Sequence, residues 1–317
     1  MNGIGTAAVA AQVTLVVVGA PLLTGVMRKV RARLEGRAGA AVTQPWRDLR
    51  KLLRKEAITP LGTGPAFRAA PPLLVATTAV VAALVPLVST TTPVSRRADL
   101  ILVVALLGLG TVAVALAGLD TGTAFGGMGA SRQMTVAALV EPTILLAVFA
   151  LSMPTGSTNL SAIVTGGLHD PVRLASPAGL LATAALAVAV LAETGRLPVD
   201  NPATHLELTM VHEATALEFA GPDLALVELG TQMRLTVLLG LLASLSAPWG
   251  IATTTTPLAL ALALAVLTAK VALLGAALAA AEVFWAKLRL FRVPELLAGS
   301  FLLAVLAVTA SYFLTGE

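Results

Sequence analysis

The segment ADLILVVALLGLGTVAVALAGL, residues 98–119, decides the class of fold. It carries one charged residue, Asp99, near its start, and an uninterrupted apolar run follows. A helix rises about 1.5 Å per residue, so a run of about 20 residues matches the bilayer hydrocarbon core of roughly 30 Å. The apolar residues do not alternate with polar ones, which favours a helix over a strand of a membrane barrel. The segment therefore predicts a transmembrane helix.

Comparable segments recur along the whole chain. Its 317 residues are 57% hydrophobic and only 12% charged, and backbone groups inside lipid are satisfied only within helices or closed barrels. We expect an all-α integral membrane protein of the cell membrane, with one polytopic domain over residues 1–317. The eight predicted transmembrane helices are residues 4–27, 69–90, 98–119, 134–152, 177–193, 224–247, 257–280 and 298–315.

The positions of the basic residues predict the orientation of the chain. Eleven of the 21 Lys and Arg residues lie in residues 28–68, which the positive-inside rule assigns to the cytoplasm. Both termini then face the outer, periplasmic side. The net charge of +4 follows this topology, so we expect no nucleic-acid partner. The expected long cytoplasmic loops are residues 28–68, 120–133, 194–223 and 281–297, approximately.

Two of these loops contain distinctive motifs. WRDLRKLLRKE, residues 46–56, has apolar Trp46, Leu49 and Leu53 at helical spacing and predicts a short helix lying flat on the membrane surface, with QPW as the turn and helix start before it. Basic residues at that surface attract anionic lipid by about 1 kcal/mol each. LDTGTAFGGMGASRQ, residues 119–133, is glycine-rich but lacks the Gly-Lys-Ser/Thr of a phosphate-binding loop. Its glycines instead favour close backbone approach to another chain or a neighbouring helix.

The stretch ETGRLPVDNPATHLELTMVHEATALEFAGPDLALVE, residues 193–228, holds seven of the 17 acidic residues. Residues 203–220 contain no Pro or Gly, which predicts a helix. The string HEATA within it lacks the second His of the zinc motif HExxH, and the chain has no Cys for thiolate-bound clusters. We therefore expect no catalytic residue, metal or cofactor in this chain.

Four charged residues lie at least one helical turn inside the predicted spans: Glu141, Glu228, Arg234 and Lys270. An ionised side chain at the centre of a membrane helix costs about 2.5–3.5 kcal/mol, so these residues should face the bundle interior. One interpretation is a static salt bridge, in which Glu141 pairs with Arg234 or Lys270. The other is a proton path, because buried neighbouring carboxylates can hold protons near neutral pH. That path would comprise Glu141, Glu193, Asp200, Glu207, Glu213, Glu218, Glu228, Arg234 and Lys270.

Seven motifs spread over nearly the whole chain carry a family resemblance. They are PLLTGVMRKVRARLEGR (21–37), QPWRDLRKLL (44–53), GLDTGTAFGGMGASR (118–132), VEPTILL (140–146), GSTNLS (156–161), ETGRLPVDNPATHLELTMVHEA (193–214) and AKLRLFRVP (286–294). With them the chain resembles the membrane subunit of formate hydrogenlyase and of related membrane-bound nickel–iron hydrogenases. That subunit is itself similar to one of the membrane subunits of complex I, the bacterial NADH–quinone oxidoreductase.

The resemblance implies eight membrane helices and several partner subunits. Iron–sulfur clusters and a nickel–iron centre would lie in peripheral small and large hydrogenase subunits on the cytoplasmic side, and antiporter-like subunits would lie beside the chain in the membrane. The relatives divide over quinone binding, so quinone is an alternative partner alongside lipid. We expect docking of the peripheral partner through Arg37, Gln44, Trp46, Asp48, Asp120, Gly126, Gly127, Gly129, Arg132 and Arg196.

The resemblance also implies roles for individual acids. In the complex I relatives, acids of this loop and its flanking helices form a funnel between the quinone chamber and the proton-pumping arm. The motif positions that match are Glu141, Glu193, Asp200, Glu207 and Glu218. Family members often read SRE where this chain reads SRQ, so Gln133 removes one acid from such a relay.

These observations lead to one main hypothesis and two alternatives. The main hypothesis is a membrane subunit that anchors a hydrogenase or complex I-like redox arm and couples electron transfer to proton or sodium movement. The first alternative is a stand-alone proton-linked secondary transporter, which would need no arm. The second is a purely structural membrane anchor, in which the buried charges only stabilise the fold.

Overall fold

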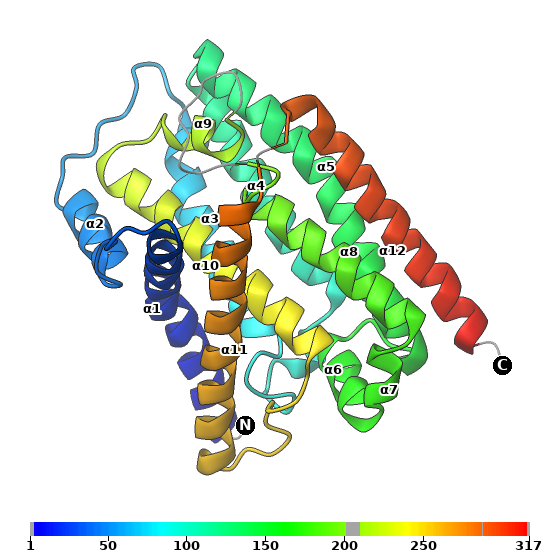
Figure 1. Cartoon of the computed structure of the whole chain (residues 1–317). Coiled ribbons are helices and arrows are strands. Elements are labelled where there is room, and N and C mark those ends of the chain that lie inside the picture. Colours follow the sequence, from blue (N-terminus) through cyan, green and yellow to red (C-terminus); the bar gives the residue numbers. More distant parts are fainter. Residues whose placement is uncertain (1–2, 201–209, 287, 316–317) are drawn as a thin grey trace.

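The computed structural model describes residues 3–200, 210–286 and 288–315, and their regular secondary structure is helical (Figure 1). Seven of the described helices are long and apolar enough to cross a membrane. The chain is therefore an all-α multi-pass membrane protein, as predicted. These helices are α1 Gly3–Leu34, α3 Pro65–Leu84, α4 Leu100–Asp120, α5 Ala124–Ser152, α10 Gly221–Ser246, α11 Pro257–Phe284 and α12 Val293–Thr315.

Helix α10 lies in the middle of the bundle. It packs against α1, α3, α8 and α11, while α12 lies along α5 and α8 on the side away from α1 and α11 (Figure 1). Shorter elements connect the long helices and cover the two ends of the bundle. They are α2 Gln44–Leu53, α6 Leu160–His169, α7 Pro171–Leu174, α9 His212–Ala216 and the 3-10 turns η1 Ser95–Arg97, η2 Met153–Thr155 and η3 Leu290–Arg292.

Helix α8, Pro177–Glu193, coincides with the fifth predicted span but has only 17 residues. Its last residue, Glu193, pairs with Arg234, which lies halfway along α10. Helix α8 therefore ends level with the middle of α10, and residues 194–200 continue as irregular chain beside an internal cavity. Irregular backbone at this depth is tolerated where it is enclosed by protein or borders a cavity.

The glycine-rich segment is mostly helical, so the predicted loop over residues 120–133 is wrong in extent. Helix α5 begins at Ala124, where the Thr123 hydroxyl oxygen accepts a hydrogen bond from the N–H of Gly126 at 2.9 Å and caps the helix. A Cβ added at Gly126 would lie 2.5 Å from the carbonyl oxygen of Gly118 in α4. The glycine thus permits close contact of two helices within one chain.

The expected helix over residues 203–220 is wrong in its described part, where α9 has only five residues. The Asp200 carboxylate accepts hydrogen bonds from the backbone N–H groups of Val211 at 3.1 Å and His212 at 3.3 Å. In a continuous helix these two groups would bind carbonyl oxygens four residues earlier. The side-chain acceptor replaces them, so α9 starts at His212.

Candidate functional site: a charged cavity within the bundle

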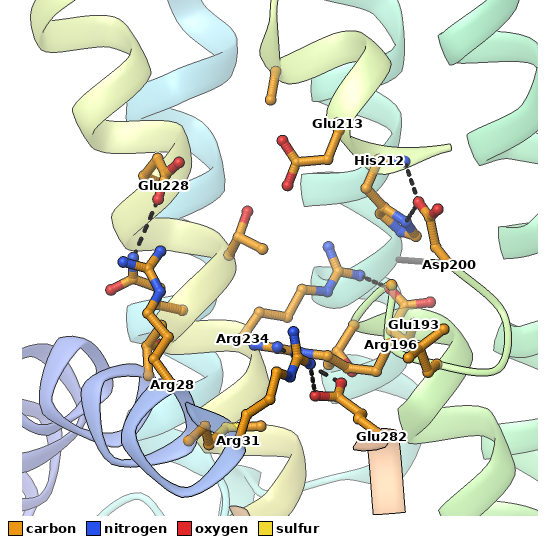
Figure 2. A pocket seen from close by; sticks show the side chains of 18 of the residues that line it. Arg28, Arg31, Glu193, Arg196, Asp200, His212, Glu213, Glu228, Arg234 and Glu282 are labelled. Atoms are coloured by element: carbon orange, nitrogen blue, oxygen red, sulfur yellow. Dashed lines mark hydrogen bonds and ion pairs between the residues drawn. The ribbon is translucent and has the colours of Figure 1, made fainter. Parts of the chain in front are cut away.

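A cavity of about 850 Å³ lies among α1, α4, α9, α10, α11 and the chain after α8 (Figure 2). It extends from the ends of α1 and α11 to Arg234 in the middle of α10. The lining mixes apolar side chains with an unusual share of this chain's ionisable groups. Those labelled in Figure 2 are Arg28, Arg31, Glu193, Arg196, Asp200, His212, Glu213, Glu228, Arg234 and Glu282.

The inner end of the cavity is formed by the ion pair of Glu193 and Arg234, each 6% exposed. The Arg234 guanidinium also donates hydrogen bonds to the Thr111 hydroxyl at 2.7 Å and to the Leu107 carbonyl oxygen at 2.9 Å, both in α4. The cation lies at the C-terminal end of α8, where the helix dipole favours positive charge. One arginine therefore joins α4, α8 and α10.

Glu141 lies in the middle of α5 and its carboxylate contacts α4 at Gly108. A Cβ added at Gly108 would approach a Glu141 carboxylate oxygen to 2.9 Å, so only glycine leaves room for the acid. Gly108 is one helical turn from Thr111, and Glu141 is within electrostatic range of both Glu193 and Arg234. Arg234 makes its ion pair with Glu193, so the predicted Glu141–Arg234 salt bridge is not the arrangement that forms.

The cavity mouth contains a cluster of one buried acid and two half-buried bases. The Glu282 carboxylate of α11 pairs with Arg31 of α1, and its other oxygen lies 3.8 Å from a guanidinium nitrogen of Arg196. Burial lowers the pKa of the Arg196 guanidinium, the Glu282 charge raises that pKa, and nearby Arg31 lowers it. Arginine remains charged despite such shifts. The cluster thus connects α1, α11 and the chain after α8.

A second set of polar contacts organises the segment around α9. The His212 ring nitrogen Nδ1 lies 3.9 Å from the Asp200 carboxylate, which is 2% exposed. The Thr215 hydroxyl donates to the side-chain oxygen of Gln133 at 3.3 Å, and Gln133 lies in the cavity wall. Figure 2 shows Glu213 directed into the open part of the cavity.

The remaining predicted acids are distributed between the cavity and the protein surface. Glu228 lines the cavity and accepts a hydrogen bond from the Gln232 amide at 3.2 Å. Glu218 is outside the cavity lining and accepts one from the Thr123 hydroxyl at 2.6 Å. Glu207 lies outside the described residues. The structure thus brings Glu193, Asp200, Glu213 and Glu228 together around one cavity.

Lys270 is not part of this cluster. Its ammonium donates hydrogen bonds to the carbonyl oxygens of Ala247 and Trp249, and it lies 5.1 Å from the centre of the Trp249 ring. These carbonyls follow the C-terminal end of α10, where the dipole attracts a cation. Arg234 is twelve residues before that end of α10, about 18 Å away along the helix axis.

Several residues predicted for partner docking make contacts within the chain. Asp120 accepts hydrogen bonds from the N–H groups of Gly64 and Phe67, which start α3. The Trp46 indole donates to the Val18 carbonyl oxygen, and Arg132 donates to that of Met210. The Gln44 amide donates a hydrogen bond to Asp48, whose carboxylate lies 3.5 Å from a guanidinium nitrogen of Arg28. Arg37 pairs with Glu35 at the surface. Arg196 belongs to the Glu282 cluster at the cavity mouth.

The glycines of α5 allow a matched prediction about close helix contacts. A Cβ added at Gly129 would lie 2.8 Å from the Cβ of Ala214, whereas one at Gly127 would meet nothing within 4 Å. We expect Gly129→Ala to destabilise the protein by about 1–3 kcal/mol through overpacking. Gly127→Ala should leave stability unchanged or raise it by up to about 1 kcal/mol. Thermal denaturation of the detergent-solubilised variants measures both changes in stability. Equal midpoints for the two variants would contradict the close contact between Gly129 and Ala214.

Sequence reasoning missed Glu282, the shared partner of two arginines. Its available signal was a lone acid at the end of an apolar helix, immediately before the basic motif AKLRLFR. Arg31 was counted only toward the positive-inside excess, although its side chain is 21% exposed and lines the cavity. Charge counting cannot distinguish a surface base from a buried one, because both lie on the same side of the membrane.

The fold and the site define a polytopic membrane protein whose helices enclose a cavity lined by ionisable groups, a feature that marks ion and substrate pathways. The chain belongs to the NADH dehydrogenase family, whose model matches residues 6–312.

Two Escherichia coli (strain K12) proteins are similar in sequence. Formate hydrogenlyase subunit 4 is 33% identical over 91% of this chain and 92% of its own length. Hydrogenase-4 component C is 34% identical over 76% of this chain and 75% of its own length. A chain from the archaeal respiratory complex called membrane-bound sulfane sulfur reductase has the same fold, with a TM-score of 0.80 at 22% identity, covering 96% of this chain and 99% of that one.

Proposed function

We propose that this chain is the membrane-anchoring and ion-coupling subunit of a hydrogenase or complex I-like redox complex. The names of the two similar proteins, formate hydrogenlyase subunit 4 and hydrogenase-4 component C, support a hydrogenase complex over a complex I-like one. The chain is not itself the redox catalyst. Iron–sulfur clusters and a nickel–iron centre belong in this proposal to peripheral small and large subunits, and antiporter-like subunits lie beside the chain in the membrane.

One observation carries the coupling role: ionisable side chains continue from the cavity mouth to the middle of the bundle. Glu213 and Glu228 line the open cavity, and the Glu193–Arg234 pair forms its inner end. Glu141 follows, in contact with Gly108 of α4, one helical turn from the Thr111 that binds Arg234. Buried neighbouring acids can exchange protons when a nearby charge changes. A change of charge during a redox reaction in a partner docked at the cavity mouth would therefore act electrostatically on the ionisable groups within the membrane.

The proposed topology has eight transmembrane helices: the seven long ones and the shorter α8, which is the fifth span along the chain. Both termini lie on the outer side. Helix α8 supports this count because it is apolar and packs among α5, α10 and α12. The cavity mouth then opens toward the cytoplasm, where the basic residues of α2 also lie. A peripheral arm bound on that face would cover the mouth. The whole chain acts in this proposal as one domain.

Purification followed by reconstitution tests the proposal. The tagged chain, expressed together with its neighbouring genes, should co-purify with peripheral redox subunits. In proteoliposomes the complex should generate a membrane potential when electrons pass through it, and a protonophore or sodium ionophore identifies the ion. A chain that purifies alone and transports a small solute would instead establish a secondary transporter. A complex that transfers electrons without any potential would establish a structural anchor.

A further inference from the structure

Arg196 lines the cavity mouth, and its side chain is 15% exposed. A guanidinium group has five N–H donors. Among the residues that the structure describes, the guanidinium of Arg196 donates no hydrogen bond, and its ion pair is with a Glu282 oxygen 3.8 Å away. Polar groups removed from bulk water are almost always hydrogen-bonded. The free donors of Arg196 therefore indicate an acceptor that does not belong to this chain.

Arg31 of α1 approaches the same carboxylate from the other side (Figure 2). It pairs with one oxygen of Glu282, whereas Arg196 is near the other oxygen. Two guanidinium groups thus flank one carboxylate, and the Glu282 side chain is 1% exposed. Two positive charges and one negative charge leave a formal excess of one positive charge. A single external anion would balance the cluster.

The charges on the cavity wall are separated by sign. The other arginines of the lining have acidic partners of their own, in the pairs Arg28–Asp48, Arg37–Glu35 and Arg234–Glu193. Figure 2 shows the lining acids Asp200, Glu213 and Glu228 near α9 and α10, on the opposite side of the cavity from Glu282. An anion would therefore be attracted to the mouth, beside Arg31 and Arg196.

The mouth is at the depth of the cytoplasmic lipid headgroups in the proposed topology. The apolar run of α1 ends at Met27, and the basic residues begin with Arg28. Trp285 directly follows α11, is 45% exposed and lines the mouth. Tryptophan and basic side chains both favour the interface between membrane and water. The phosphate groups of the inner leaflet are consequently at the level of the two flanking arginines.

We propose that Arg31 and Arg196 bind the phosphodiester group of a membrane phospholipid at the cavity mouth. The planar guanidinium fork matches the geometry of phosphate oxygens, and a phosphodiester carries the single negative charge that balances the cluster. Pockets for drug-sized ligands have volumes of about 300–1,000 Å³. This cavity of about 850 Å³ has room for a headgroup, and Met27, Leu197 and Val283 offer apolar contacts for the acyl chains. The inference uses the proposed topology but not the ion-coupling role.

Lipid retention by the full-length chain tests this site. Native mass spectrometry of the protein purified in a mild detergent should show one phospholipid per chain that persists after washing. Arg196→Gln should weaken its retention at least about 10-fold, because charge-assisted hydrogen bonds to the phosphate are lost. Glu282 keeps its Arg31 partner in this variant, so the fold should be preserved.

Arg33→Gln is the matched control. Arg33 lies two residues after Arg31 on the same helix, but it is exposed and outside the cavity lining. This variant should retain the phospholipid as the wild type does. Equal retention by Arg196→Gln and Arg33→Gln would overturn the inference.

Added ligands identify the chemical group that is bound, and they need no variant. Dioleoylphosphatidylglycerol should raise the melting temperature of the washed wild-type protein more than dioleoylglycerol, which has the same acyl chains without the phosphate. Equal stabilisation by the two lipids would overturn the phosphate site. Stabilisation by inorganic phosphate alone would support the oxyanion site but overturn its assignment to lipid.

The same retention measurement on the intact complex separates lipid from a protein partner. A phospholipid that is present on the chain alone but absent from the complex would overturn the inference and assign the two arginines to an acidic group of a partner subunit. None of these measurements depends on ion translocation, so failure of the proposed coupling role would leave their outcome unchanged.

Discussion

Arg234→Gln is expected to lower the stability of the protein by about 3–5 kcal/mol, the usual cost of removing one partner from a buried ion pair. The Glu193 carboxylate would remain 6% exposed with its counter-ion gone. The hydrogen bonds from Arg234 to Thr111 and to the Leu107 carbonyl would be lost as well. Three helices meet at this side chain, so thermal denaturation of the solubilised protein should begin at a clearly lower temperature.

Two further variants separate the ion pair from a general loss of packing. Arg47→Gln removes an exposed charge from α2, and its effect should stay within about 0.5 kcal/mol. The double variant Arg234→Gln, Glu193→Gln leaves no unpaired buried charge and should recover more than half of the lost stability. A double variant no more stable than Arg234→Gln alone would show that the pair is not the source of the effect.

Glu141→Gln is expected to reduce ion translocation by at least about 100-fold while electron transfer and assembly persist. Removing a group that must carry a proton typically costs a factor of about 10²–10⁴, and glutamine cannot carry one. The amide has nearly the same size as the carboxyl group, so the close contact with Gly108 is retained. The measurement is the membrane potential generated per electron transferred in proteoliposomes.

Glu56→Gln is the control, because Glu56 is exposed in the loop before α3. It should leave translocation at the wild-type level. Normal translocation by Glu141→Gln would remove Glu141 from the path and favour the alternative of a structural anchor, in which the acid only fills the space beside α4.

The seven long helices were predictable because a membrane span depends on local composition. The predicted span 98–119 and α4 Leu100–Asp120 differ by two residues at the start and one at the end. The short helix α2 was predictable from its apolar spacing and its preceding turn, although it begins two residues before the predicted residues 46–56 and ends three residues before their end. The extent of α5 was not predictable from the sequence. Glycines that suggested a loop are tolerated within a helix that packs closely against α4 and α9.

The candidate site was predictable in its residue types but not in its pairing. Glu141 and Arg234 were identified from charge placed within apolar segments, and Glu193 from the acid-rich stretch and the family motif. Their partners depended on helix rotation and depth, which sequence spacing does not determine. Glu193 rather than Glu141 faces Arg234, and Lys270 reaches the far end of α10 because a long flexible side chain extends to the polar groups nearest to it.

The sequence by itself determined that this protein crosses the membrane as a bundle of helices, since lipid admits long apolar segments and satisfies no free backbone group. It also determined where the scarce charges lie along the chain. Only the tertiary structure decided which charges meet, because the cavity is enclosed by segments as distant as Arg31, Arg196 and Glu282. An ionic interaction depends on separations of a few ångströms in space, and those are set by how the helices pack together.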